Sequence, residues 1–191
     1  MKLSVRILIG VVTSVFLFAA ITTPAPAAGI KIGFVFSMTG GAAVYGTSQK
    51  EGVSLAIDQI NAAAGSSGLK IVPIFEDDAS VPQQGTNVFN KLINGDKVSL
   101  IIGPTLSNTA KITDPIAQKA GVPVLAISNT ISGITEIGNY IFRDSLTENV
   151  VIPHTVKIAK QKLGLKKVSI LYGNDDAMTK ATYEVFKKVL Q

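Results

Sequence analysis

Short apolar runs alternate along this chain with longer stretches in which an apolar residue returns every third or fourth position. The run IKIGFVF at 30–36 is of the first kind, and β-rich runs of this length predict strands. Residues 46–64 are of the second kind, because Val53, Ile57 and Ile60 fall on one side of a helix. The pattern therefore predicts an alternation of strands and amphipathic helices.

The predicted strands share a run of aliphatic or aromatic residues; they are residues 30–36, 69–75, 98–102, 122–127, 140–142 and 167–172. Pro73 has no amide hydrogen to donate, which places the second strand at an edge of its sheet. The near-continuous apolar run at 98–102 suits a parallel strand that is covered on both faces.

The predicted helices share the apolar spacing of three and four residues; they are residues 46–64, 80–94, 107–120, 147–163 and 177–190. We expect Ser80 to cap the second helix, with Pro82 in its first turn. Pro115 lies inside the third helix and predicts a kink or a break there.

Strands and helices joined by such short connections indicate parallel β-α-β units, so we expect an α/β fold with a doubly wound parallel sheet. Residues 28–144 form the predicted first ligand-binding lobe, and residues 145–191 form the start of an incomplete second α/β lobe. A lobe of roughly 45 residues is too small to bury both faces of its own sheet.

The first 27 residues have the pattern of a cleavable secretory signal peptide. Lys2 and Arg6 precede an apolar run at 7–21, and the small residues Ala25 and Ala27 satisfy the rule for cleavage after Ala27. The run is shorter than the roughly 20 apolar residues that a membrane span needs, which makes the alternative of an anchor weaker. We therefore expect a periplasmic protein.

Composition removes several classes of function. The chain has no Cys, which rules out a thiolate zinc site and a Cys nucleophile, and its single His154 makes a His-based metal cluster improbable. The net charge is +5, but the basic residues form no stripe and Trp is absent, so nucleic-acid binding has little support. We expect no metal and no cofactor.

Polar residues collect in the loops that follow the predicted strands, where open α/β sheets bind their ligands. Ser107 lies between a strand and a helix start, so its hydroxyl and the first free amides suit a carboxylate, or else it is an ordinary N-cap. Ser128 and Thr130 offer oxygen acceptors for an ammonium group, or else they are turn residues. Tyr45 is either a wall of the site or a surface ring.

Two pairs of adjacent acidic residues suggest roles other than binding a carboxylate or an ammonium group. Asp77 and Asp78 follow a strand and offer a divalent metal two carboxylates, although the loop after the next strand holds no third acid. Asp175 and Asp176 are expected at a solvated helix start. The loop GGAAVYG at 40–46 has no nucleotide-binding spacing.

Four features follow the predicted signal peptide. In chain order they are a Ser/Thr-Gly loop with an aromatic residue at 37–46, a strand that ends in Glu-Asp-Asp at 76–78, GPTLS at 103–107 and SNT at 128–130. In this order they resemble the extracytoplasmic solute-binding proteins of branched-chain amino-acid transport systems, the leucine-binding type I family. The resemblance implies a two-lobed clamp without catalytic activity. Such a clamp captures an amino acid or a related small carboxylate and delivers it to an inner-membrane ABC permease.

The resemblance also implies a role for each candidate residue. Ser107 matches the serine that binds the ligand carboxylate together with neighbouring amides. Ser128, through its backbone carbonyl, and Thr130 match the positions that take the ammonium group. Tyr45 matches the aromatic residue at the mouth of the pocket.

The chain departs from the family in two ways. A Tyr-Gly pair usually lies beyond the strand at 167–172, whereas Ala177 and Met178 stand at those positions here. Family members are also much longer, so we expect a C-terminally truncated member, a split-gene product or a fragment. The open alternatives are a ligand-sensing domain of a receptor, a truncated fragment without function, and a secreted α/β hydrolase or phosphatase using Asp77 and Asp78.

Overall fold

A computed structural model describes residues 29–65 and 68–191, so the predicted signal peptide at 1–27 lies outside the described residues. Five parallel strands form one sheet in the order β2-β1-β3-β4-β5. They are β1 (Ile30–Phe36), β2 (Ile71–Asp77), β3 (Leu100–Ile102), β4 (Val124–Ala126) and β5 (Ile141–Arg143). The chain moves outward from β1 to β2 and then returns past β1, which confirms the doubly wound α/β fold.

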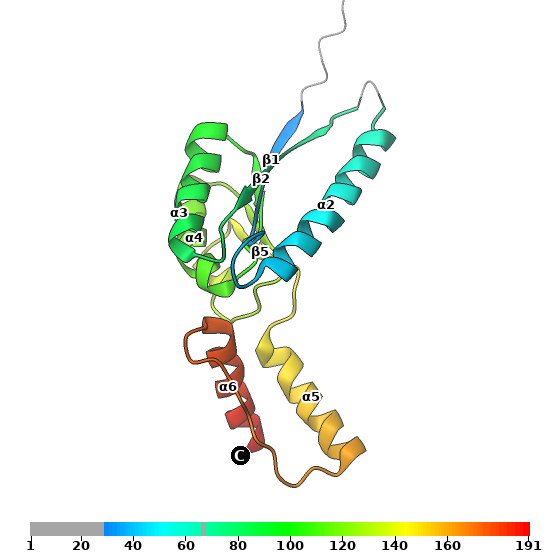
Figure 1. The fold of residues 1–191 in the computed structure, drawn as a ribbon, viewed down its shortest axis with the longest axis vertical. Helices are drawn as coiled ribbons and strands as arrows, with labels where there is room; N and C mark the ends of the chain where they lie inside the picture. Colours follow the sequence, from blue (N-terminus) through cyan, green and yellow to red (C-terminus); the bar gives the residue numbers. More distant parts are fainter. Residues whose placement is uncertain (1–28, 66–67) are drawn as a thin grey trace, which may run out of the picture.

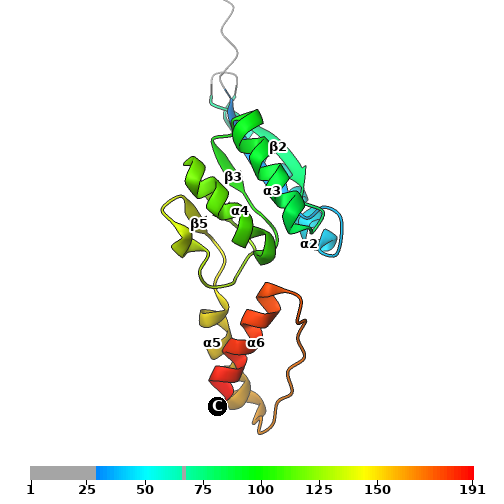
Figure 2. The same ribbon diagram turned by 90° about the vertical axis from the view of Figure 1, so that its left-hand side faces the viewer.

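The helices are α2 (Ala43–Ala63), α3 (Pro82–Asn90), the π-helical continuation η1 (Lys91–Asp96), α4 (Ser107–Ala120), the 3-10 turn η2 (Thr135–Ile137), α5 (Glu148–Leu163) and α6 (Ala177–Leu190). Helix α2 covers one face of the sheet, and α3 and α4 cover the other (Figure 1). Turned by 90°, the molecule shows α3 and α4 side by side in front of the strands (Figure 2).

The three prolines for which the sequence predicted a local effect, Pro73, Pro82 and Pro115, differ in outcome. Pro73 lies in β2, which has β1 as its single neighbour, so the predicted edge position is confirmed. Pro82 is in the first turn of α3, as predicted. Pro115 does not break α4, which continues from Ser107 to Ala120, so the prediction of a break there is wrong.

The expectation that Ser80 caps α3 is also wrong. Val81 is the N-cap residue, and no side chain caps this helix. The Ser80 hydroxyl instead donates to the Thr39 carbonyl (2.8 Å) and accepts the Ala42 amide (3.0 Å). Ser80 therefore joins the loop after β2 to the loop after β1.

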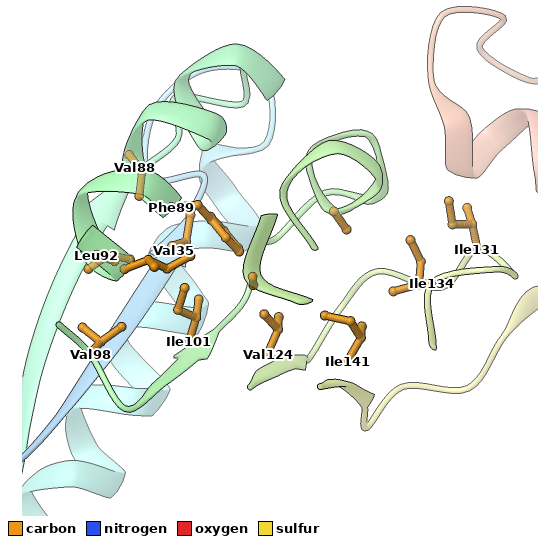
Figure 3. Packing of buried hydrophobic residues seen from close by; sticks show 13 residues of the cluster. Val35, Val88, Phe89, Leu92, Val98, Ile101, Val124, Ile131, Ile134 and Ile141 are labelled. Carbon is orange, nitrogen blue, oxygen red and sulfur yellow. The ribbon is translucent and has the colours of Figure 1, made fainter. Parts of the chain in front are cut away.

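The core lies on both faces of β1 because successive side chains of a strand point to opposite faces. Val35 belongs to a large cluster under α3 and α4, together with Phe89, Ile101 and Val124 (Figure 3). Phe34 and Phe36 face the other way and pack with Ile32 and Ile57, under α2. A strand buried on both faces requires the continuous apolar sequence that β1 has.

The predicted strand at 167–172 is wrong. These residues form no strand, and Leu171 is 99% exposed. A strand needs a neighbour for its backbone hydrogen bonds, and within the described part of the chain no strand runs beside this segment. The chain after β5 therefore consists of α5 and α6, packed against each other below the sheet (Figure 1). The lobe boundary near residue 144 remains a proposal.

Across residues 29–65 and 68–191, no helix is both long enough and apolar enough to cross a bilayer.

Candidate functional site

The loops after β1, β3 and β4 meet at the carboxyl edge of the sheet, and Thr105 joins them. Its hydroxyl accepts the Ser37 amide (3.0 Å) and donates to Gln49 Oε1 of α2 (2.6 Å). Its carbonyl accepts the Ser128 hydroxyl from the loop after β4 (2.7 Å). Thr105 is only 5% exposed, so this network fixes the floor of the site. Thr105 was not among the site residues predicted from the sequence.

Asp77, at the end of β2, fixes the loop after β1 by accepting hydrogen bonds from it. Its Oδ1 accepts the amides of Met38 (2.9 Å), Thr39 (3.2 Å) and Ala79 (2.8 Å), and its Oδ2 accepts the Thr39 hydroxyl (2.6 Å). Desolvation raises the pKa of Asp77, but these hydrogen bonds together lower it below its usual value. Four hydrogen bonds to one carboxylate leave it little capacity to bind a metal ion.

Asp78 has a similar structural task. It is fully buried, and its Oδ1 accepts the Ser37 hydroxyl (2.6 Å) and the Ser80 amide (3.0 Å). Burial raises the pKa of this carboxyl group. Among the residues that the structure describes, no group of three His, Cys, Asp or Glu side chains gathers at one point. The geometry thus gives no support to a metal-dependent phosphatase that uses Asp77 and Asp78.

Two glycines allow the loops to approach so closely. Gly46, in the first turn of α2, lies against the Ser37 backbone, and a Cβ atom there would overlap the Ser37 carbonyl. Gly103, just after β3, has a φ of +120°, and a Cβ atom there would overlap the Val35 carbonyl. These contacts bring Tyr45 and Ser107 to the same edge of the sheet.

Ser107 is the first residue of α4 rather than its cap. Leu106 is the N-cap, no side chain caps the helix, and its first turn holds no acidic residue. The Ala110 amide donates to the Leu106 carbonyl (3.0 Å), so the amides of residues 107–109 precede the first intrahelical hydrogen bond. Ser107 is 3% exposed, yet its hydroxyl has no hydrogen-bond partner. A buried hydroxyl beside free amides suits an anion.

A cavity of about 150 Å³ opens in front of Ser107. Its lining consists of Tyr45, Thr105, Leu106, Ser107, Ser128, Asp176 and Met178. Three of the four predicted site residues are therefore brought together. Tyr45 is 67% exposed, which puts it at the rim of the cavity rather than at its floor.

Thr130, the fourth predicted residue, does not line this cavity. Its hydroxyl donates a hydrogen bond to Glu148, in the first turn of α5. Glu148 is 7% exposed, and its Oε2 has no partner. The role of Thr130 toward a ligand stays a prediction. Glu148 was not among the residues predicted from the sequence, because its burial depends on tertiary structure.

Asp176 and Met178 reach the cavity from the start of α6. Asp176 caps that helix by accepting the Thr179 amide (2.7 Å), which agrees with the expected helix start. Asn108 of α4 holds it in place: Asn108 Nδ2 donates to Asp176 Oδ2 (3.3 Å), and the Ala177 amide donates to Asn108 Oδ1 (2.9 Å). The sequence contained no signal that this cap would face Ser107.

Residues 29–191 match the family described as "Periplasmic binding protein". The "Leucine-, isoleucine-, valine-, threonine-, and alanine-binding protein" of Pseudomonas aeruginosa is 32% identical over 161 residues, which cover 84% of this chain and 43% of that protein. The chain thus spans less than half the length of this relative.

Solved structures of binding proteins are similar in fold and sequence. LivJ of Streptococcus pneumoniae, in complex with isoleucine, superimposes with a TM-score of 0.80 at 32% identity and covers 84% of this chain and 46% of its own. A solute binding protein of Rhodopseudomonas palustris BisB5, in complex with 3,4-dihydroxybenzoic acid, gives 0.75 at 31% identity and covers 84% and 43%. This chain belongs to the periplasmic binding protein family.

Proposed function

We propose that this chain is part of an extracytoplasmic substrate-binding protein of an ABC importer, without a catalytic role. It captures a branched-chain amino acid or a related small carboxylate and delivers it to a membrane permease. The observation that carries the proposal is the buried, unpartnered hydroxyl of Ser107 at the uncapped start of α4, facing a small cavity. The family membership supports the extracytoplasmic location and the permease as partner.

The start of α4 suits a carboxylate better than the starts of α5 and α6, because each of those two helices has an acidic residue of its own at its cap or in its first turn. Glu148 lies in the first turn of α5, and Asp176 caps α6. Each places a negative charge at the positive end of its helix. The first turn of α4 has none, so its amides and the Ser107 hydroxyl are available to a ligand anion.

The ammonium group of an amino acid ligand needs oxygen acceptors. Ser128 lines the same cavity as Ser107, and Thr130 lies two residues further along the same loop. The relatives' ligands, isoleucine in one structure and 3,4-dihydroxybenzoic acid in another, both carry a carboxylate next to an apolar body. That shared chemistry favours Ser107 as the anchor, with Tyr45 as a wall at the rim.

Isothermal titration calorimetry of this chain with aliphatic amino acids and hydroxybenzoates tests the proposal. We expect Ser107→Ala to weaken binding of every carboxylate ligand by about 1–3 kcal/mol, because the ligand oxygen loses a buried partner. Ser48→Ala, an exposed serine on α2, is the matched control and should leave affinity unchanged. The proposal fails if no such compound binds more tightly than millimolar, or if both variants bind like the unaltered chain.

A further inference from the structure

Asp176 is the one acidic or basic side chain among the residues that line the Ser107 cavity. The remaining lining residues are neutral: the hydroxyl side chains of Tyr45, Thr105, Ser107 and Ser128, and the apolar side chains of Leu106 and Met178. A carboxylate beside a site built for a carboxylate ligand needs an explanation, because like charges at short range disfavour binding.

The hydrogen bonds of Asp176 leave part of its carboxylate unused. Oδ1 accepts the Thr179 amide at 2.7 Å, and Oδ2 accepts Asn108 Nδ2 at the long distance of 3.3 Å. A carboxylate offers about four lone-pair sites, so about two remain. In the described part of the chain, the salt bridges within 4.0 Å are formed by Lys91, which pairs with Glu76 and Asp96, and Asp176 takes part in none of them.

Hydrogen bonds of a residue next to Ser107 fix the position of the Asp176 side chain. Asn108, one residue after Ser107, accepts the Ala177 amide (2.9 Å) and donates to Asp176, so one side chain ties the start of α6 to the start of α4. The two poles of the cavity, the Ser107 hydroxyl and the Asp176 carboxylate, are therefore fixed relative to each other by neighbouring residues. Asn108 acts here as a positioning residue.

We propose that Asp176 pairs with the ammonium group of the ligand and thereby selects α-amino acids against carboxylic acids that lack an amino group. The inference rests on the proposed function. An α-amino acid places a cation next to its carboxylate, which satisfies Ser107 and Asp176 together. A simple carboxylate or a hydroxybenzoate leaves the half-buried carboxylate of Asp176 without a counter-charge, and a charge that loses water to the bound ligand without gaining a partner opposes binding.

The size of the cavity agrees with a small zwitterion. Its volume of about 150 Å³ is well below the roughly 300 Å³ at which pockets for drug-sized ligands begin. Leu106 and Met178 supply apolar surface for an aliphatic side chain. Of the two ligand types in the related structures, a pairing with Asp176 favours an amino acid such as isoleucine over an aromatic acid such as 3,4-dihydroxybenzoic acid.

Matched ligand pairs that differ only in the ammonium group test this inference by calorimetry on the full chain. The pairs are L-valine with 3-methylbutanoate, L-isoleucine with 3-methylpentanoate, and L-leucine with 4-methylpentanoate. We expect the amino acid of at least one pair to bind about tenfold or more tightly than its partner, as a charged hydrogen bond implies. Asp176→Asn should reduce that ratio below about threefold by weakening the amino acid alone.

The chain offers matched controls. Asn is as good an N-cap as Asp, so Asp176→Asn preserves α6, and circular dichroism checks this. Asp175→Asn removes the same charge one residue away, at an exposed side chain that does not line the cavity, and should leave the ratio unchanged. An unchanged ratio in Asp176→Asn, or an equal effect of Asp175→Asn, overturns the inference.

Ser107→Ala separates this inference from the proposed function. It should weaken both members of a pair to the same extent, since both carry the carboxylate. If it does so while Asp176→Asn leaves the ratio intact, the proposed function stands and Asp176 is not the selective residue. If none of the six compounds and no hydroxybenzoate binds the unaltered chain, the proposed function fails and the inference fails with it.

Discussion

The sheet and the helical pair below it are built from similar proportions of apolar sequence, yet they bury it very differently. Among the residues that the structure describes, the buried hydrophobic ones lie between Ile32 and Ile141, except Ile152 and Val156 of α5. Helix α6 has no buried residue at all. The difference teaches that amphipathic helices of an α/β protein depend on a sheet to cover their apolar faces.

Several large apolar side chains of the helical pair α5 and α6 are exposed to solvent. Ile158 is 52% exposed and Leu163 is 70% exposed, both on α5. Helix α5 packs against α6, which covers one of its faces and leaves others in contact with solvent. By contrast, α3 and α4 lie on the sheet, and their inner residues Phe89 and Ala117 are completely buried.

The largest expected effect comes from breaking the better-packed region. Phe89→Ala should lower the free energy of unfolding by about 3–5 kcal/mol, because a fully buried ring at the centre of the cluster leaves a cavity. Phe186 on α6 is half-buried, so Phe186→Ala should cost only about 1 kcal/mol. Urea unfolding followed by circular dichroism measures both. Equal costs would show that the two regions are equally well packed.

A buried carboxyl group inside the sheet region gives the second prediction. Asp114 of α4 is fully buried, its Oδ2 has no partner, and burial raises its pKa to about 7. The Thr113 hydroxyl is its hydrogen-bond donor, at 3.4 Å. Because the folded protein holds this proton more tightly than the unfolded chain does, stability should fall as the pH rises from about 4 through about 7.

Asp114→Asn removes this dependence, since an amide has no proton to lose in that range. We expect the variant to unfold at a higher urea concentration than the unaltered chain at pH 8, with a gain in the free energy of unfolding of a few kcal/mol at most. At pH 4.5 the two should unfold at a similar concentration. Glu184→Gln, at an exposed position on α6, is the control and should leave the pH profile as it was. A profile that Asp114→Asn does not flatten contradicts the prediction.

The sequence predicted the loops that form the site better than the contacts made within it. Ser107 was identifiable because a strand ending in a Gly-Pro loop before a helix fixes the place of the first helical residue. Asp176 was not, because its approach to Ser107 depends on how α6 lies against α4, which no local pattern records. The link between Thr130 and Glu148 was missed for the same reason, since it joins two elements 18 residues apart.

The failure at 167–172 has a different cause. The residues have the β-branched, alternating composition of a strand, and composition is a local property. Strand formation requires hydrogen bonds to another strand, which is a tertiary property. Helices α5 and α6 were predicted correctly on either side because a helix satisfies its own backbone.

The smallest expected effect sharpens the comparison most. Leu171 is 99% exposed in this segment, so Leu171→Ala should change the free energy of unfolding by no more than about 0.5 kcal/mol. Leu92 is fully buried between η1 and the sheet, and Leu92→Ala should cost about 2–5 kcal/mol by the same urea measurement. The two changes delete the same atoms, so their difference reports packing alone. A cost above about 2 kcal/mol at Leu171 would mean that this side chain is buried in solution, which would contradict its exposure in the structure.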